Sequence, residues 1–385
     1  GEVMPEEHLR MGLLDRANGL ATTQASFTER QGIRLYGEVA EGGSEAICHN
    51  AVLDDLACPG DVVVGTDSHT CTAGALGAFA FGVGATDMAN GWYTTDFRVR
   101  VPETVHFELT GELPPDCSAK DVMLHIMATP YIREGKAIGQ VLEFTGESVE
   151  AMNLDERATL TNMAVEAGAT TGIIPADDKL VTELATKRGV SEAAVRGELL
   201  RSDPDAQFAA SFTLDLSGLR PMVATPGDPR NGIHIETLGE PVKVDIAYGG
   251  SCTGGKMTDM DLYAQVLKRA VAQGQRIAPW VDMYIQFGSQ NIRRYAESRG
   301  YIDLFTKAGA RLVNPSCGAC IKAGPGVSFT DKQVTISAIN RNFPGRSGPG
   351  QVYLASPLVV AASAIAGYII EPNALEGNMA ETASI

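Results

Sequence analysis

Two short stretches in the C-terminal part of the chain decide its fold. Residues 249–255 read Gly-Gly-Ser-Cys-Thr-Gly-Gly, and residues 314–320 read Asn-Pro-Ser-Cys-Gly-Ala-Cys. Their cysteines, Cys252, Cys317 and Cys320, lie on glycine-rich turns, where small residues let backbone N–H groups approach sulfur, as in iron–sulfur sites. Neither stretch has a fourth cysteine nearby, so one iron of a four-iron cluster would stay open. An open iron is a Lewis acid that can polarise a hydroxyl or a carboxylate.

Two other chemistries fit cysteines at this spacing. A structural zinc ion usually takes a second Cys-x-x-Cys pair or a nearby histidine, and neither flanks Cys252. A thioredoxin-like redox pair would use Cys317 and Cys320 but would not require Cys252. The cysteines alone therefore leave a cluster, a zinc ion and a redox pair open.

Length and charge set limits on the organisation of the chain and on its partners. At 385 residues the chain exceeds the usual size of one hydrophobic core, so two or three domains are expected. The formal net charge of -16 argues against nucleic acid or an anionic membrane as the main partner. An anionic substrate would therefore need a local group of positive side chains.

Cysteine usage and the apolar segments indicate a compartment. Seven cysteines are an odd number in a long chain and suit a reducing, cytoplasmic setting better than a disulfide framework. The first ten residues are charged and lack an apolar core, so no signal peptide is expected. The longest apolar stretch, residues 357–370, is too short to span a bilayer and is expected to form a buried helix.

Hydrophobic patterning predicts an α/β fold. A short buried strand at 61–64 is expected to run into a polar turn, with a helix of small residues at 73–90 behind it. Such an arrangement places reactive side chains at the carboxyl end of a sheet. Strands near 241–248 and 311–313 should deliver the cysteines to a common sheet edge. The other expected elements are a strand at 101–113, a linker at 225–232, and helices at 118–128 with Ser118 as N-cap, 154–168 and 259–271.

Four motifs occur in the order found in one known family. They are Gly-Thr-Asp-Ser-His-Thr-Cys-Thr at 65–72, Ser-Cys-Thr at 251–253, Cys-Gly-Ala-Cys at 317–320 and Asn-Arg-Asn-Phe-Pro-Gly-Arg at 340–346. In these motifs the chain resembles the aconitase superfamily, and most closely the large subunits of 3-isopropylmalate dehydratase in the form shared with archaeal homoaconitases. The resemblance covers the chain from about residue 35 to 370.

The resemblance implies an aconitase-like fold, with three-layer α/β/α domains around a central iron–sulfur cluster. The domains it implies are residues 1–103, incomplete at the N-terminus, residues 104–235, and residues 236–385, which carry the cluster cysteines.

The same resemblance implies the cofactor and its surroundings. Cys252, Cys317 and Cys320 would hold a [4Fe–4S] cluster whose open iron binds the substrate hydroxyl and a carboxylate. Asn162 and Asn340 match asparagines that line the cluster, and amide donors to sulfur would raise its potential. Without the family, either asparagine would be an ordinary turn or cap residue.

Substrate-binding residues also follow from the resemblance. Arg341 and Arg346 match arginines that bind carboxylates, because guanidinium groups pair with carboxylates through two hydrogen bonds. Ser68 is assigned to substrate binding with them. Taken alone, arginines on a loop are more often solvated surface charges.

The acid–base residues that the family implies are Asp67, His69, His49 and Glu166. His49 matches a histidine near the substrate hydroxyl, and a histidine is suited to protonate a leaving hydroxide near neutral pH. Glu166 matches a carboxylate that pairs with His69, which would fix the tautomer of the ring and raise its pKa. Without the family, Asp67 and Ser68 would be helix caps and Glu166 would lie on a solvated helix face.

The chain departs from the family pattern in three respects. Gly1 and Glu2 stand where the family usually has Asp-His, so an acid–base pair is either truncated or lost. Gly254 stands where asparagine commonly follows Ser-Cys-Thr, and Lys256 replaces a frequent arginine. We expect these changes to affect turnover and substrate choice more than the fold.

The family also implies a partner and an activity. In single-chain aconitases a swivelling domain supplies a catalytic serine, and this chain has no Gly-Ser-Ser-Arg motif, so a separate small subunit would supply that base. The chain is then the large subunit of a hydro-lyase that isomerises a 2-hydroxy di- or tricarboxylic acid, with 2-isopropylmalate as the first candidate. Homoaconitate, citrate and 2,3-dimethylmalate remain alternatives as substrates. An iron-sensing or RNA-binding protein, or a non-catalytic cluster-binding partner, would share the same fold.

Overall fold

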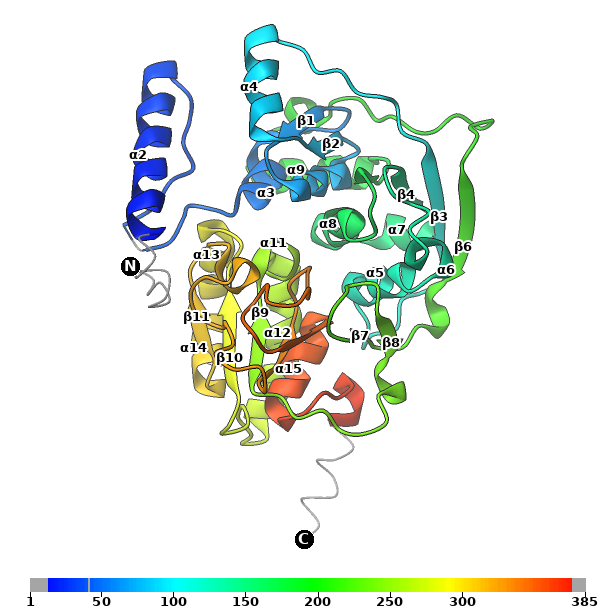
Figure 1. The fold of residues 1–385 in the computed structure, drawn as a ribbon. Helices are drawn as coiled ribbons and strands as arrows, with labels where there is room; N and C mark the ends of the chain where they lie inside the picture. The colour runs from blue at the N-terminus through cyan, green and yellow to red at the C-terminus, as the bar shows by residue number, and fades with distance from the viewer. Residues whose placement is uncertain (1–12, 41, 376–385) are drawn as a thin grey trace.

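The computed structural model describes residues 13–40 and 42–375, which form three sheets with helices packed around them (Figure 1). The expected departure at Gly1 and Glu2 lies outside the described residues. Each sheet contains parallel strand pairs. The fold is therefore α/β with parallel sheets, as the sequence predicted.

The strands are β1 Val62–Gly65, β2 Phe79–Gly82, β3 Thr104–Thr110, β4 Val141–Thr145, β5 Thr171–Ile173, β6 Ala210–Asp215, β7 Met222–Ala224, β8 Gly232–His234, β9 Ile246–Gly249, β10 Asp282–Gln286, β11 Arg311–Val313, β12 Val334–Ser337 and β13 Gln351–Ala355. The helices are α2 Leu13–Gln31, α3 Cys48–Ala51, α4 Ala85–Thr94, α5 Ala119–Met127, α6 Pro130–Arg133, α7 Glu147–Ala151, α8 Leu154–Asn162, α9 Asp178–Arg188, α10 Glu192–Val195, α11 Ser251–Gly254, α12 Met257–Ala272, α13 Gln290–Ser298, α14 Tyr301–Ala308 and α15 Pro357–Ala366.

The seven-stranded sheet has the order β11-β10-β9-β12-β13-β7-β8. Its first five strands are parallel, and β7 and β8 extend it antiparallel. Successive side chains of β9 point to opposite faces. Ala247 joins the core formed with α12 to α15, and Tyr248 joins the core shared with α5 and the four-stranded sheet. Both faces are therefore covered, as is usual for parallel strands.

The four-stranded sheet has the order β5-β4-β3-β6 and is parallel throughout. Along β3, Val105, Phe107 and Leu109 are fully buried, and they share one core with residues of α5. His106 and Glu108 alternate with them on the other face, where His106 contacts hydroxyls of the neighbouring strands. This alternation is the pattern of a sheet with one buried and one more open face.

The two-stranded sheet corrects one prediction. The helix expected at 73–90 is wrong, because this segment holds the end of a 3-10 helix at Ser68–Leu76, then β2, and then the start of α4. Gly77 ends the 3-10 helix with φ 72, and β2 returns to pair parallel with β1. A side chain at Gly74 would collide with the carbonyl oxygen of Gly172. The small residues here serve close packing of backbones rather than helix formation.

The linker expected at 225–232 is also wrong. This run forms the turn between β7 and β8, whose register pairs Ala224 with Gly232. Proline and glycine mark a tight turn as readily as a linker. The predicted boundary between the second and third domains lies at residues 235 and 236, but β7 and β8 before it belong to the same sheet as β9 after it. The division into three domains stays a prediction.

Other local predictions are confirmed. Ser118 is the N-cap of α5 and forms a capping box with Asp121, and residues 357–366 form the buried helix α15. The helix expected at 154–168 is shorter: α8 ends at Asn162 and a 3-10 turn follows at Met163–Val165.

Candidate active site

The three cysteines of the opening stretches line one cavity of about 240 Å³. Cys252 lies on α11, directly after β9, and Cys317 and Cys320 lie at a 3-10 turn that follows β11. Because β9, β10 and β11 are parallel neighbours, their carboxyl ends meet at one edge of the sheet. All seven cysteines are free of disulfides.

Two buried asparagines reach the sulfur atoms. The Nδ2 of Asn162 donates to Cys252 Sγ at 3.3 Å, and the Nδ2 of Asn340 lies 3.7 Å from the same sulfur. The Oδ1 of Asn340 accepts from Cys320 Sγ at 3.4 Å. Both asparagines are fully buried, so neither is a solvent-facing cap. Amide donors of this kind stabilise negative charge on sulfur.

The cavity also holds His49, Asp67 and His69. Asp67 Oδ1 lies 3.1 Å from His49 Nε2 and 3.3 Å from His69 Nδ1, and it accepts from the His69 backbone N–H at 2.8 Å. Asp67 is thus the N-cap of the 3-10 helix and a partner of both rings. The hydrogen bonds from His49 and His69 hold the pKa of Asp67 far below its usual range.

His69 lies between two carboxylates. Its Nε2 is 2.9 Å from Glu166 Oε1 and 2.8 Å from Asn340 Nδ2. Burial lowers the pKa of His69, but Glu166 and Asp67 outweigh burial and leave it raised. The pKa of His49 is likewise raised, because the Asp67 and Cys48 contacts outweigh burial. Both rings are therefore biased towards the protonated form.

Glu166 is buried with its side chain 0% exposed. Burial raises its pKa, but His69 and Arg341 more than offset burial and leave the pKa lowered. Arg341 Nε donates to Glu166 Oε1 at 2.6 Å, and its Nη2 donates to Ser68 Oγ at 2.8 Å. Ser68, Glu166 and Arg341 thus form a chain of contacts that starts at His69.

Arg346 differs from Arg341 in its contacts. It lines the cysteine cavity, and its Nη2 lies 3.8 Å from Cys320 Sγ. Its Nε is buried without a hydrogen-bond partner in the part of the chain that the structure describes. A buried guanidinium donor without a partner fits an anionic ligand that would accept from it.

Comparison with known proteins shows similarity over most of the length of this chain. A family profile described as Aconitase family (aconitate hydratase) matches residues 14–367. The 3-isopropylmalate dehydratase large subunit 1 of Methanopyrus kandleri is 40% identical over 349 residues, covering 90% of this chain and 79% of that protein. The chain belongs to the aconitase family.

Further members of the family resemble the chain to the same degree. The 3-isopropylmalate dehydratase large subunit 1 of Pyrococcus furiosus is 39% identical over 350 residues, with 90% of this chain and 79% of that protein covered. The large subunit from Aquifex aeolicus is 39% identical over 350 residues, with 90% and 78% covered. The crystal structure of Thermococcus kodakaraensis aconitase X (holo-form) is a more distant match, with a TM-score of 0.49, 11% identity, and 82% of this chain and 69% of that chain covered.

Two departures of this aconitase-family chain have a structural context. A side chain at Gly254 would bring its Cβ within 2.7 Å of Ala338 Cβ, so the Cys252 loop packs tightly on the loop that carries Asn340. Lys256 is buried, pairs with Asp259 at 2.8 Å and donates to the carbonyl oxygen of Thr253. In this chain, Gly254 therefore allows the Cys252 loop to pack closely on its neighbour, and Lys256 holds that loop through the Thr253 carbonyl.

The sequence analysis missed several side chains at the site. Cys48 lines the cavity, with Sγ 3.6 Å from His49 Nε2. Lys120 is buried on α5 and donates to the carbonyl oxygen of Ile339 at 2.6 Å, which holds the Asn340 loop. Burial lowers the pKa of Lys120 to about 7. A buried lysine next to a helix N-cap carries no sequence signal that distinguishes it from a surface lysine.

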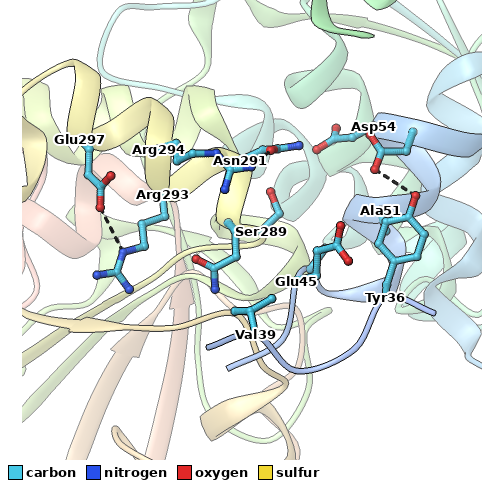
Figure 2. Close-up of a pocket in the computed structure, with 13 residues that line it drawn as sticks. Tyr36, Val39, Glu45, Ala51, Asp54, Ser289, Asn291, Arg293, Arg294 and Glu297 are labelled. Atoms are coloured by element: carbon cyan, nitrogen blue, oxygen red, sulfur yellow. Dashed lines mark hydrogen bonds and ion pairs between the residues drawn. The ribbon is translucent and has the colours of Figure 1, made fainter. Parts of the chain in front are cut away.

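A larger cavity of about 440 Å³ is lined in part by Glu45, Ala46 and Ala51, which are close to His49 in the sequence. Figure 2 shows that charged side chains line it, with Arg293 and Glu297 joined to each other at 3.3 Å. Asp55 accepts from Tyr36 at 3.0 Å. Since these charged groups have partners within the wall of the cavity, the cysteine cavity is the better candidate for a reactive site.

Within residues 13–40 and 42–375, no helix combines the length and the apolar character needed to cross a membrane.

Proposed function

We propose that this chain is the large subunit of a cytoplasmic hydro-lyase that interconverts 2-isopropylmalate and 3-isopropylmalate. The observation that carries the proposal is that Cys252, Cys317 and Cys320 line the same cavity as a histidine pair and Arg346. The relatives are named as 3-isopropylmalate dehydratase large subunits, which supports this reaction and, with it, a place in leucine biosynthesis.

The donor set fits a [4Fe–4S] cluster held by Cys252, Cys317 and Cys320. Burial raises the pKa of Cys252 to about 12, so this sulfur needs a bound cation to remain a thiolate. Amides of Asn162 and Asn340 point at the same sulfur. When bound, such a cluster would supply an open iron that acts as a Lewis acid towards the substrate hydroxyl and a carboxylate.

Side chains of the cavity would bind the carboxylates of the substrate. Arg346 offers its buried Nε, and a carboxylate at that position would satisfy it. Arg341 lies at the edge of the site, with its side chain 20% exposed, and would bind the second carboxylate while Glu166 fixes its orientation. Local positive charge of this kind is what an acidic chain needs to bind a dicarboxylate.

Acid–base chemistry would come from both subunits. His49 would give a proton to the leaving hydroxide, which departs as water, and Asp67 would favour the protonated ring before this step. A serine of a separate small subunit would take the proton from the adjacent carbon, leaving an alkene. Addition of water in the opposite sense would then place the hydroxyl on the neighbouring carbon. His69, held between Asp67 and Glu166, would keep a positive charge beside the substrate.

The experiment is an activity assay of the anaerobically reconstituted chain with and without its cognate small subunit. The panel holds 2-isopropylmalate, homoaconitate, citrate and 2,3-dimethylmalate. We expect turnover of 2-isopropylmalate by the complex and none by the isolated chain, because loss of a positioned base costs on the order of 10² to 10⁴ in rate. Robust turnover by the isolated chain, or preference of the complex for another acid, would contradict the proposal.

A further inference from the structure

Strand β10 lies between the two strands that carry the cysteine loops. In the register of the sheet, Ile285 of β10 pairs with Gly249 of β9, and Gln286 pairs with Val313 of β11. β9 ends three residues before Cys252, and β11 ends four residues before Cys317. The last residue of β10, Gln286, therefore stands at the sheet edge between the two loops.

The side-chain amide of Gln286 is fully buried and contacts both loops. Its Oε1 accepts from the backbone N–H of Ser251 at 3.2 Å. Its Nε2 donates to the carbonyl oxygen of Ser316 at 2.9 Å and lies 2.9 Å from Ser316 Oγ. Ser251 directly precedes Cys252, and Ser316 directly precedes Cys317. One amide group thus joins the residues in front of two cluster cysteines.

Both loops pack against this side chain through glycines. Gly250 has φ 144, and a Cβ there would lie 2.5 Å from the Cβ of Gln286. Gly318 has φ 48, and a Cβ there would lie 2.9 Å from Gln286 Nε2. The positive φ angles are tolerated because glycine has no Cβ. The loops can therefore close on the amide from both sides.

An apolar residue of similar size would fill the same space but would not replace these contacts. The N–H of Ser251, a residue that is 3% exposed, would lose its partner. The Ser316 carbonyl would lose its donor at the same time. Because an amide both accepts and donates, glutamine satisfies the two loops at once. This dual contact is the feature that a space-filling role does not explain.

We propose that Gln286 is a positioning residue that fixes the loop at 249–255 relative to the loop at 314–320 and so pre-forms the three-thiolate site. The inference rests on the proposed cluster at Cys252, Cys317 and Cys320. A site that is already ordered loses less chain entropy when it binds its cofactor. The contacts of Gln286 with Ser251 and Ser316, which we call the Gln286 clamp, should therefore favour retention of the cluster.

The test compares Gln286→Met, Gln286→Glu and the control Ser363→Ala, which removes a buried hydrogen bond to Ile370 N–H from α15. Amide hydrogen exchange is measured on the cluster-free chain, and cluster loss to a chelator is measured on the reconstituted chain. In Gln286→Met we expect both loops to exchange on the order of tenfold faster, with α12 unchanged, and the cluster to be lost faster by a similar factor. Gln286→Glu keeps the acceptor for Ser251 and should loosen the loop at 314–320 alone.

Two outcomes would overturn the inference. The first is wild-type exchange in both loops of the Gln286 variants, and the second is equal loosening of the loops in Ser363→Ala. If Gln286→Met does not fold, the selective effect expected in Gln286→Glu still decides the matter. If the wild-type chain takes up no cluster, the proposed function fails, while exchange in the cluster-free chain still tests the clamp.

Discussion

Replacing Glu166 by glutamine should destabilise the chain in a pH-dependent way. The carboxylate of Glu166 is fully buried and contacts His69 Nε2 at 2.9 Å and Arg341 Nε at 2.6 Å. Glutamine keeps the shape and one acceptor oxygen but removes the charge. Both contacts use Oε1, so an amide oxygen can still accept from them, but Arg341 and a protonated His69 then face no negative charge at this position.

The size of the effect follows from the burial of the pair. Removing one partner of a buried ion pair costs about 3 to 5 kcal/mol. Arg341 is 20% exposed, so water can solvate part of its charge after the substitution. We therefore expect a loss of about 3 kcal/mol in the free energy of unfolding near pH 6, the lower end of that range.

The pH dependence has a defined sign. The raised pKa of His69 means that its share of the stabilisation is full below its unfolded value of 6.5 and is lost as pH rises through its folded pKa. The lowered pKa of Glu166 means that its share is full above its unfolded value of 4.5 and is lost as pH falls through its folded pKa. Both shares are full between these values. The cost of Glu166→Gln should be largest there and smaller at pH 9, where His69 has lost its proton.

The assay is urea unfolding of the cluster-free chain, followed by circular dichroism at pH 6 and pH 9. The matched control is Glu143→Gln, since Glu143 is 8% exposed and accepts from the Ser202 hydroxyl at 2.8 Å. The control should lose less than about 1 kcal/mol at both pH values. An equal loss for the two variants, or a loss in Glu166→Gln that grows from pH 6 to pH 9, would refute the reasoning.

Three further outcomes test the cluster site. Exposure to air should remove the open iron first and give a three-iron cluster seen by electron paramagnetic resonance, and loss of the whole cluster in one step would argue for a fully ligated site. Arg346→Lys in the complex should raise KM for the hydroxy acid roughly tenfold, because lysine cannot form a bidentate pair. Arg311→Lys, at the opposite end of β11, is the control and should leave KM unchanged. Asn162→Ala should lower the reduction potential of the cluster by roughly tens of mV in a potentiometric titration, and an unchanged potential would show that its contact with Cys252 has no electronic role.

Local chemistry made several elements predictable from the sequence. Ser118 caps α5 because its own hydroxyl accepts a backbone N–H of the first turn. The residues of α15 are almost all apolar, so this helix is stable only when it is buried in the core. The prediction of a helix at 73–90 was wrong because Gly74 and Gly77 pack against backbone from distant parts of the sequence. The local residue pattern carries no information about those distant segments.

The site shows the same division between local and distant information. The cysteine turns pointed to metal chemistry by their residue types, and family resemblance drew attention to His69 and Glu166, which are 97 positions apart in sequence. Lys120 and Gln286 escaped notice because their partners lie on other elements. In the sequence, a glutamine or lysine that joins two buried loops cannot be distinguished from a polar residue on the surface. The three-dimensional structure is needed to show which loops it contacts.

Mössbauer spectroscopy of the chain reconstituted anaerobically with ⁵⁷Fe tests the central claim most directly. Spectra are recorded with and without 2-isopropylmalate in the presence of the small subunit. If Cys252, Cys317 and Cys320 hold a [4Fe–4S] cluster with one open iron, one of the four irons should change its spectrum when the substrate binds. A spectrum in which all irons ignore the substrate, or a chain that binds zinc in place of iron, would contradict the account.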